Sequence, residues 1–302
     1  MPYIKKRISL PKEVPAYKAL MENLGFSIGK AQQMIDKKRV FCKDGELTTK
    51  NQLVSDFIEI IAYEPNPKGL KPIYENAHFA LFDKPSGVLT HPAGRKTLYS
   101  LTDEILHLYG NSAHIVHRLD KETSGLILVA KNLVSEIELK KLFEDRAVSK
   151  SYIAFVKGHL DKKLKIDAPL LNSSEYENLK QKMIVSNLGK DALTKIEPVK
   201  YIKDKDFTII KAIPITGRQH QIRAHLFHVK HPIVGDPLYG VNYDVSCDYL
   251  DEKLSKNERI IKTGASRLLL HAYSLSFKYR GKSYFFQSGI GDQFLKATSI
   301  LN

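Results

Sequence analysis

The sequence predicts an α+β protein with a small separate module at its N-terminus. From about residue 74 onward, strand-like and helix-like apolar patterns mix irregularly, which favours α+β over a regular βαβ array. Before that point, the segment 63–72 holds three prolines and one glycine, and proline suits a spacer because it cannot donate to a strand ladder. We therefore expect a module at 1–62, a linker at 63–73 and a large domain at 74–302.

The first 62 residues contain two short helical patterns followed by strand patterns. Ala16–Leu24 and Gly29–Lys38 carry apolar residues at helical spacing. A Lys-Asp-Gly turn at 43–45 separates a short strand at Arg39–Cys42 from an apolar strand at Phe57–Ala62. The module is thus predicted to have two helices and a small antiparallel sheet.

The remaining chain is predicted to form a sheet with a few helices. Helical patterns cover Glu136–Asp145 and His220–His228. The expected strands are His78–Phe82, Leu126–Ala130, Tyr152–Val156, Phe207–Ile213 and Leu268–Phe277.

The charge of the chain points to a polyanionic partner. The formal net charge is +14 and the sequence pI is about 9.5, which favours nucleic acid over a membrane surface, since no basic amphipathic helix stands out. Cys42 and Cys247 lack metal-type spacing and do not suggest a disulfide framework. No signal-peptide pattern and no apolar run of roughly 18 residues is present, so we expect a cytoplasmic protein without a membrane segment.

The strongest local signal is the run from His117 to Gly125. His117, Arg118, Leu119 and Asp120 precede a Thr-Ser-Gly turn, and the turn leads into the apolar strand LILVAK. The end of a buried strand can hold a carboxylate rigidly, so Asp120 is a candidate catalytic group. Taken alone, such an aspartate is more often a helix cap or a salt-bridged surface residue.

The whole run resembles the HRLDxxTSG motif of RluA-type RNA pseudouridine synthases, and further motifs of that family follow in order. The resemblance implies a mixed-sheet catalytic domain that isomerises uridine to pseudouridine in RNA. The other matching segments are Lys84–Pro92, Lys150–Tyr152, Thr216–Leu226 with the following HPIVGDPLYG, and Leu269–Ala272.

The resemblance also implies roles for individual residues. Asp120 is the catalytic carboxylate, with attack on the uracil ring, attack on the anomeric carbon and abstraction of a ribose proton all left open. Arg223 is implied to keep Asp120 ionised, and Tyr152 to pack against the base. The remaining residues expected to bind RNA or the base are Arg118, which would fill the space of the flipped uridine, Leu270 as an apolar wall, Lys84 and His117.

The N-terminal module resembles the small αL RNA-binding domain found on many of these enzymes. Lys30, Lys37, Lys38 and Arg39 are then expected to line a phosphate-binding face. A solvated helix face is the competing interpretation.

The chemistry implied by the resemblance requires no cofactor, because the reaction gains no atom or electron. The four histidines at 220, 225, 228 and 231 suggest a metal site by spacing, but the arginines and lysine among them favour structural or RNA-facing roles, so no metal is expected. We expect a monomeric enzyme with large-subunit ribosomal RNA as substrate. A tRNA substrate, or a non-catalytic RNA-binding protein of ribosome assembly on the same fold, are the alternatives.

Overall fold

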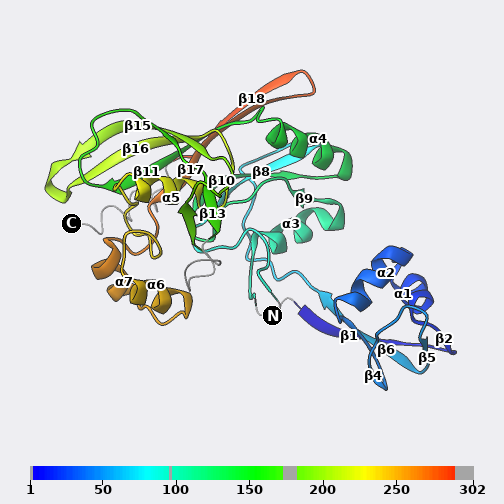
Figure 1. Ribbon diagram of the computed structural model, residues 1–302. Coiled ribbons are helices and arrows are strands. Elements are labelled where there is room, and N and C mark those ends of the chain that lie inside the picture. Colours follow the sequence, from blue (N-terminus) through cyan, green and yellow to red (C-terminus); the bar gives the residue numbers. More distant parts are fainter. Residues whose placement is uncertain (1–2, 95–96, 173–181, 290–302) are drawn as a thin grey trace. The chain divides into compact units, whose positions relative to one another are not determined.

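The computed structural model describes residues 3–94, 97–172 and 182–289 (Figure 1). Contacts divide the chain into two compact units. Unit 1 comprises residues 1–68 and 92–107, and unit 2 comprises residues 69–91 and 108–302. No helix in the described part of the chain is long and apolar enough to cross a membrane.

Unit 1 has a hydrophobic core of its own. Its helices carry buried apolar residues on one face, including Ala19 and Leu20 of α1 and Ala31 and Ile35 of α2. Its four-stranded sheet has the order β1-β6-β3-β4, and β1 pairs antiparallel along the full length of β6. The elements are β1 (Tyr3–Ser9), β2 (Val14–Pro15), α1 (Ala16–Leu24), α2 (Ile28–Asp36), β3 (Val40–Cys42), β4 (Gly45–Glu46), β5 (Leu53–Val54) and β6 (Phe57–Tyr63).

The helices of unit 1 begin and end where local chemistry requires. Ser27 caps α2 by accepting a hydrogen bond from the backbone of Lys30. Gly25 ends α1 with φ of 65°, a left-handed conformation that glycine adopts without steric cost. The predicted helices are therefore present, whereas strand β1 had no prediction, because three consecutive basic residues, Lys5 to Arg7, interrupt any apolar alternation.

The segment predicted as a linker is held by hydrogen bonds along its first half. The hydroxyl of Tyr63 and the backbone N–H of Asn66 both donate to the buried carboxylate of Asp103, at 2.7 and 2.9 Å. The backbone N–H of Lys68 donates to Glu104 at 2.5 Å. Residues 92–107 group with unit 1 through these contacts, which composition alone did not reveal.

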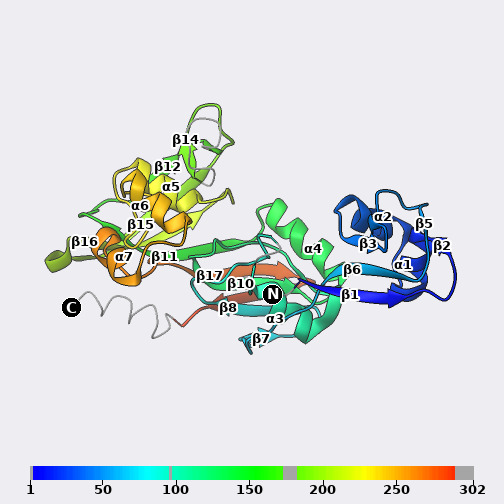
Figure 2. The same ribbon diagram turned by 90° about the horizontal axis from the view of Figure 1, so that it is seen from below.

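Unit 2 is built on a ten-stranded mixed sheet (Figures 1 and 2). Its main path has the order β12-β15-β16-β11-β17-β10-β8-β7, with β18 beside β17 and β9 beside β10. The pairing of β10 with β17 is parallel, and the others are antiparallel. The strands are β7 (Tyr74–Glu75), β8 (Phe79–Lys84), β9 (His114–Ile115), β10 (Ser124–Ala130), β11 (Ser149–Lys157), β12 (Leu164–Asp167), β15 (Leu193–Ile202), β16 (Phe207–Pro214), β17 (Leu270–Tyr279) and β18 (Lys282–Gln287).

Strand β10 lies at the centre of the core of unit 2. All of its residues are buried, because neighbouring elements cover both of its faces. Its Leu126 and Leu128 pack with Leu139 of α4 and with Phe79 of β8. The remaining elements of unit 2 are the short pair β13 (Leu170–Asn172) and β14 (Met183–Val185), and the helices α4 (Leu133–Glu144), α5 (Gln221–His228), α6 (Tyr243–Leu250) and α7 (Lys256–Thr263), whereas most of helix α3 (Leu101–Tyr109) belongs to the 92–107 segment of unit 1.

The predicted mixture of strands and helices is confirmed by this arrangement. The five predicted strands correspond to β8, β10, β11, β16 and β17, and the two predicted helices to α4 and α5. Boundaries shift by a few residues at most, as expected for helix and strand ends.

Candidate active site

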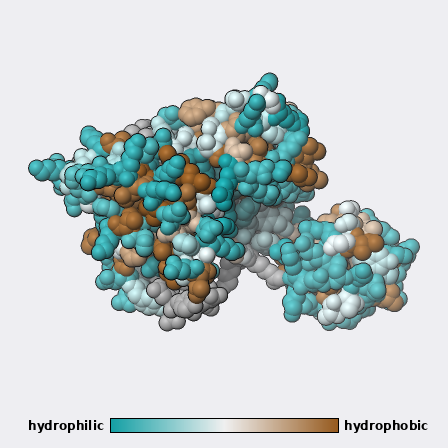
Figure 3. Space-filling view, turned by 45° about the horizontal axis from the view of Figure 1, so that its top comes forward, coloured by the Kyte–Doolittle hydropathy of each residue, from teal (hydrophilic) through white to brown (hydrophobic). Residues whose placement is uncertain are grey.

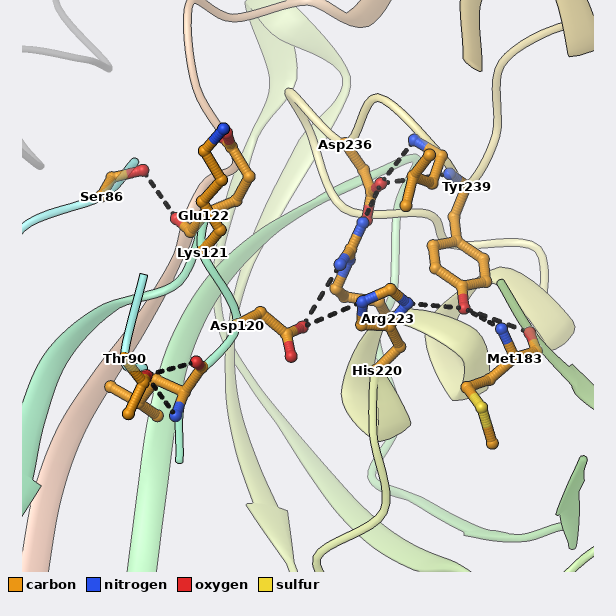
Figure 4. Close-up of polar contacts among 12 residues, drawn as sticks. Ser86, Thr90, Asp120, Lys121, Glu122, Met183, His220, Arg223, Asp236 and Tyr239 are labelled. Atoms are coloured by element: carbon orange, nitrogen blue, oxygen red, sulfur yellow. Dashed lines mark hydrogen bonds and ion pairs between the residues drawn. The ribbon is translucent and has the colours of Figure 1, made fainter. Parts of the chain in front are cut away.

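Asp120 lies in a loop that hydrogen bonds fix on both sides. This loop joins β9 to β10, and Thr90 holds it by donating to the carbonyl of Leu119 at 2.7 Å and accepting from the Leu119 N–H at 3.2 Å (Figure 4). On the other side, the Ser86 hydroxyl donates to the carbonyl of Glu122 at 2.6 Å. The backbone on either side of Asp120 is therefore fixed before any substrate binds.

Lys84 belongs to the same support. Its side chain is 0% exposed, and its ammonium donates to the carbonyls of Pro85, Val88 and Lys121. Burial lowers the pKa of Lys84 to about 7, while three carbonyl acceptors match the three N–H donors of the charged form. The expectation that Lys84 contacts RNA does not fit this position, because the side chain is enclosed and its donors are used.

The carboxylate of Asp120 faces two groups of the loop and helix that follow β16. Its Oδ2 lies 3.2 Å from Nη1 of Arg223 and 3.7 Å from Nε2 of His220, and 21% of the side chain is exposed. Burial by itself would raise the pKa of Asp120, but the opposing positive charge lowers it below its usual value. Burial also lowers the pKa of His220 to about 4, so near neutral pH Arg223 supplies that charge.

Arg223 is itself oriented by a second carboxylate. Its Nε and Nη2 donate to the two oxygens of Asp236 at 2.8 and 2.9 Å, a bidentate pair (Figure 4). Oδ1 of Asp236 also accepts from the backbone N–H groups of Leu238 and Tyr239. The guanidinium is only 3% exposed, so this pair fixes its plane and directs Nη1 toward Asp120.

His220 has an unusual backbone conformation immediately before α5. Its φ is 50°, a left-handed value uncommon outside glycine, and its side chain does not cap the helix. The ring instead lies between Asp120 and Tyr239, with Nδ1 3.3 Å from the Tyr239 hydroxyl. That hydroxyl also donates to the carbonyl of Met183 and accepts from the Met183 N–H.

Asp120, His220 and Arg223 line a pocket of about 580 Å³. Tyr152 enters it from β11 and Leu270 from the start of β17, and both are buried. The two side chains come from neighbouring strands, because β11 pairs with β17. Ala272 of β17 pairs with Tyr152 of β11 on one side and with Gly125 of β10 on the other. Burial, and then the charge of Asp120, raise the pKa of the Tyr152 hydroxyl, which keeps it protonated at neutral pH.

Basic side chains line the same pocket. Arg118, Arg146, Lys150 and Arg218 contribute to its walls. Burial lowers the pKa of Lys150, and Gly217 lies close enough that a Cβ there would sit 3.4 Å from its ammonium. A pocket with an ionised carboxylate, a buried aromatic ring and several cations fits a nucleotide with its phosphates.

The structure gathers most of the residues singled out from the sequence in this pocket. Asp120, Tyr152, Arg223, Arg118 and Leu270 all line it, and so does His117. His117 has a structural contact as well, because its Nε2 accepts a hydrogen bond from the backbone of Leu128 and its ring stacks on Phe143.

The four basic residues expected to bind phosphate belong to unit 1. Lys30 is exposed at the start of α2, and Lys37 is exposed just after its end. Lys38 forms an ion pair with Glu46 at 3.4 Å, and the guanidinium of Arg39 lies over the ring of Tyr3.

Sequence reasoning missed the roles of three residues. His220 was considered only as a metal ligand or as a structural or RNA-facing histidine, with no specific contact, and Asp236 and Tyr239 were given no role within the run HPIVGDPLYG. The signal that could have found Asp236 and Tyr239 was their position between two glycines of that run, Gly235 and Gly240. In the described part of the chain, no three His, Cys, Asp or Glu side chains are placed to hold a metal ion, and His225 instead bonds Thr194 and the carbonyl of Ala168.

Comparison with known proteins agrees with the fold. The chain resembles the structure titled "Human RNA Pseudouridylate Synthase Domain Containing 1", with a TM-score of 0.59 and 22% identity over 75% of this chain and 86% of that one. At this identity the likeness shows the fold of the chain. Residues 78–228 match the RNA pseudouridylate synthase family, and the chain belongs to this family.

Relatives extend the likeness over nearly the whole chain. An "Uncharacterized RNA pseudouridine synthase" of Helicobacter pylori (strain J99) is 37% identical over 98% of both chains. The "Ribosomal large subunit pseudouridine synthase D" of Buchnera aphidicola is 32% identical over 78% of this chain and 73% of its own. The protein is therefore an isomerase that makes pseudouridine in RNA, which confirms the enzyme class predicted from the motifs.

Proposed function

We propose that the enzyme isomerises one or more uridines of large-subunit ribosomal RNA, with Asp120 as the catalytic carboxylate. The observation that carries this assignment is the contact between Asp120 and Arg223 inside the pocket. A carboxylate that is mostly enclosed stays ionised only with a positive partner, and an arginine retains its charge at all physiological pH values.

The reaction breaks the bond between ribose C1′ and uracil N1 and forms a bond between C1′ and C5. The hydrogen on C5 is lost and N1 gains one, so atoms and electrons balance without a co-reactant. Asp120 acts beside C1′, by attack on the ring or the anomeric carbon or by removal of a ribose proton. Tyr152 packs against the uracil, and such stacking is worth roughly 1–3 kcal/mol, which offsets part of the cost of flipping the base out of its helix.

Ribosomal RNA is favoured as the substrate by two features. Unit 1 has a separate core and exposed lysines, which suits a module that adds affinity for a large folded RNA. On the face seen in Figure 3 its surface is mainly hydrophilic. A relative named for the large ribosomal subunit supports the same choice. A tRNA substrate is the alternative.

The decisive experiment maps pseudouridine in total RNA from cells with and without the gene. Sites in large-subunit ribosomal RNA that disappear with the gene and return with the wild-type copy identify the substrate. Disappearance of tRNA sites alone would overturn the ribosomal assignment, and no change at any site would contradict an active enzyme.

A variant tests the role of Asp120. Asp120→Asn keeps the shape of the side chain and removes its charge, so we expect product below detection with RNA binding retained. The matched control is Asp251→Asn, which removes a charge from an exposed pair with Lys253 and leaves turnover unchanged. Near-normal turnover by Asp120→Asn would contradict the assignment.

We also propose that the enzyme acts as a monomer in the cytoplasm. Asp120, Tyr152 and Arg223 come from one chain and line one pocket, which supports a monomeric enzyme. Light scattering during size-exclusion chromatography should give the mass of one chain, and fractionation should recover the protein without membranes. A stable dimer at micromolar concentration would contradict the first part.

A further inference from the structure

His220 is a buried polar side chain to which the chemistry described above gives no task. Its side chain is only 9% exposed, it lines the pocket, and its backbone has the left-handed conformation noted above. A non-glycine residue in that conformation indicates that surrounding structure fixes it, and such residues cluster at functional sites.

The contacts of Tyr239 determine which ring nitrogen of His220 carries the hydrogen. The tyrosine has one hydroxyl hydrogen, and it points to the carbonyl of Met183, since two acceptor oxygens 3.1 Å apart need a hydrogen between them. The hydroxyl oxygen also accepts from the Met183 N–H at 2.8 Å. The Tyr239 hydroxyl can therefore take part in a further hydrogen bond only as the acceptor. Nδ1 of His220, 3.3 Å away, must then carry the hydrogen and donate it.

Nε2 of His220 is consequently the unprotonated nitrogen of the ring. It points to the side of Asp120, but the 3.7 Å to Oδ2 is too long for a hydrogen bond, and both atoms are acceptors near neutral pH. Within the described residues, Nε2 receives no hydrogen bond. Nε2 of His220 and Oδ2 of Asp120 are thus two acceptors that lie side by side. A ligand that places a hydrogen-bond donor next to Nε2 satisfies it.

A uridine within RNA offers only two hydrogen-bond donors. They are N3–H of the base and the 2′-hydroxyl of the ribose, since the 3′ and 5′ oxygens are esterified. The 2′-hydroxyl is attached to the carbon next to C1′, where Asp120 acts, whereas N3 is separated from C1′ by N1 and C2 of the uracil ring. An acceptor adjacent to Asp120 is therefore placed for the 2′-hydroxyl.

We propose that Nε2 of His220 accepts a hydrogen bond from the 2′-hydroxyl of the target uridine, with Tyr239 holding the imidazole in the tautomer this requires. The inference rests on the proposed role of Asp120 beside the ribose. It makes His220 a specificity residue, because the 2′-hydroxyl is the group by which a protein distinguishes RNA from DNA at a given nucleotide.

The test combines one protein change with one change in the RNA. His220→Phe keeps a ring and removes the acceptor, and 2′-fluorouridine at the target removes the donor while keeping an RNA-like sugar pucker. Affinities of stem-loops with uridine, 2′-fluorouridine or 3-methyluridine at the target are measured by competition against labelled substrate at initial rates. His220→Asn, which tolerates left-handed backbone, serves as a second variant should the phenylalanine destabilise the fold.

Wild-type enzyme should bind the uridine stem-loop about 2- to 12-fold more tightly than the 2′-fluoro form, the range of one neutral hydrogen bond. In the His220 variants this preference should fall to within about 2-fold, while the effect of 3-methylation stays the same in all proteins. An undiminished preference for the 2′-hydroxyl in the variants would overturn the proposal. Loss of the response to 3-methylation instead would assign His220 to N3–H and overturn it equally.

Ring ¹⁵N shifts of His220 provide a readout that needs no RNA. The free enzyme at pH 7 should show a neutral ring protonated at Nδ1. Tyr239→Phe, which removes the acceptor for that hydrogen, should change the ratio of the two neutral tautomers. A neutral ring protonated at Nε2 would contradict the proposal. Because the competition assay compares nucleotides within one protein, a negative result with a wild-type enzyme that still makes pseudouridine rejects the role of His220 alone, and leaves the function of Asp120 in place.

Discussion

Arg223 and Asp236 form a buried bidentate ion pair that leaves one guanidinium nitrogen for Asp120. Nε and Nη2 of Arg223 bond the two oxygens of Asp236, and Nη1 lies 3.2 Å from Asp120. Asp236 is 0% exposed and is further held by two backbone N–H groups. The charge that keeps Asp120 ionised is therefore positioned by a residue that does not line the pocket.

Removing the charge of Asp236 should affect stability and turnover together. Asp236→Asn leaves the buried Arg223 with Asp120 as its remaining carboxylate partner, so we expect a loss of unfolding free energy of up to about 3–5 kcal/mol, the cost of breaking a buried ion pair. It also frees the guanidinium to turn away from Asp120, so we expect turnover to fall by at least about tenfold. Urea unfolding and single-turnover rates measure the two effects.

The exposed pair of Asp251 and Lys253 provides the matched control for that change. Both side chains are more than half exposed, so Asp251→Asn should alter stability by no more than about 1 kcal/mol and leave turnover unchanged. Equal effects of the two aspartate changes would mean that burial of the Arg223 pair has no special consequence.

Tyr152→Phe separates stacking from the hydroxyl group. The ring that packs against the uracil is retained, and the hydroxyl, whose pKa is raised by burial, is lost. We expect RNA affinity within about twofold of wild type, because base stacking of roughly 1–3 kcal/mol is preserved, with a clear reduction in turnover. Unchanged turnover would assign only a packing role to Tyr152, and Tyr152→Ala should then be the damaging change.

Gly125→Ala should damage the strand that follows the catalytic loop. Gly125 has φ of 111°, and a Cβ there would lie 2.3 Å from the carbonyl oxygen of Ala272 on β17. The two parallel strands would have to separate, at a cost of at least about 3 kcal/mol. Gly29→Ala in α2 is the control, since it has open space and should stabilise by roughly 0.5–1 kcal/mol. Thermal unfolding measures the stability of both variants, and a Gly125→Ala variant as stable as wild type would contradict the prediction.

Buried neutral histidines should make the protein sensitive to mild acid. Burial lowers the pKa of His117 to about 3 and of His220 to about 4, whereas an unfolded histidine titrates near 6.5. Between about pH 6.5 and pH 4 the unfolded chain binds protons that the folded chain does not. The free energy of unfolding should fall with decreasing pH by up to about 1.4 kcal/mol per unit for each histidine.

Single substitutions test this linkage. His220→Asn should make the dependence of unfolding free energy on pH shallower by about one proton in that window. His228→Asn, at an exposed position near the end of α5, should leave the dependence unchanged. A steeper dependence in His220→Asn, or none in wild type, would contradict buried neutral rings.

Lysines of unit 1 should contribute to the salt dependence of RNA binding. Lys30→Gln with Lys37→Gln removes two exposed charges at either end of α2. If both contact phosphates, the slope of log affinity against log salt should become shallower by about 1.4–1.8, since each contact contributes roughly 0.7–0.9. Lys43→Gln, whose ammonium already pairs with Asp56 at 3.0 Å, is the control and should change the slope little. An unaltered slope in the double variant would reject the phosphate-binding face.

Periodicity and motif order were sufficient to predict much of the fold. Strand β10 reads as a continuous apolar run because it is covered on both faces, and helices α1 and α2 show their buried sides at helical spacing. Strand β1 was not predictable, and neither were the hydrogen bonds between Asp103 and the segment 63–72. Both depend on partners far away in the sequence. A proline-rich composition indicates an extended chain, but it does not reveal whether another segment binds that chain.

The sequence by itself determined the catalytic family, the candidate residues Asp120, Tyr152 and Arg223, and the helices and strands that carry them. Those conclusions needed only residue types at fixed spacing. Only the tertiary structure decided that Lys84 supports a loop from inside, that Asp236 orients Arg223, and that the Tyr239 hydroxyl contacts the ring of His220. The physical reason is that hydrogen bonds and burial join residues from separate elements, and those relations exist only once the sheet and α5 bring the elements together.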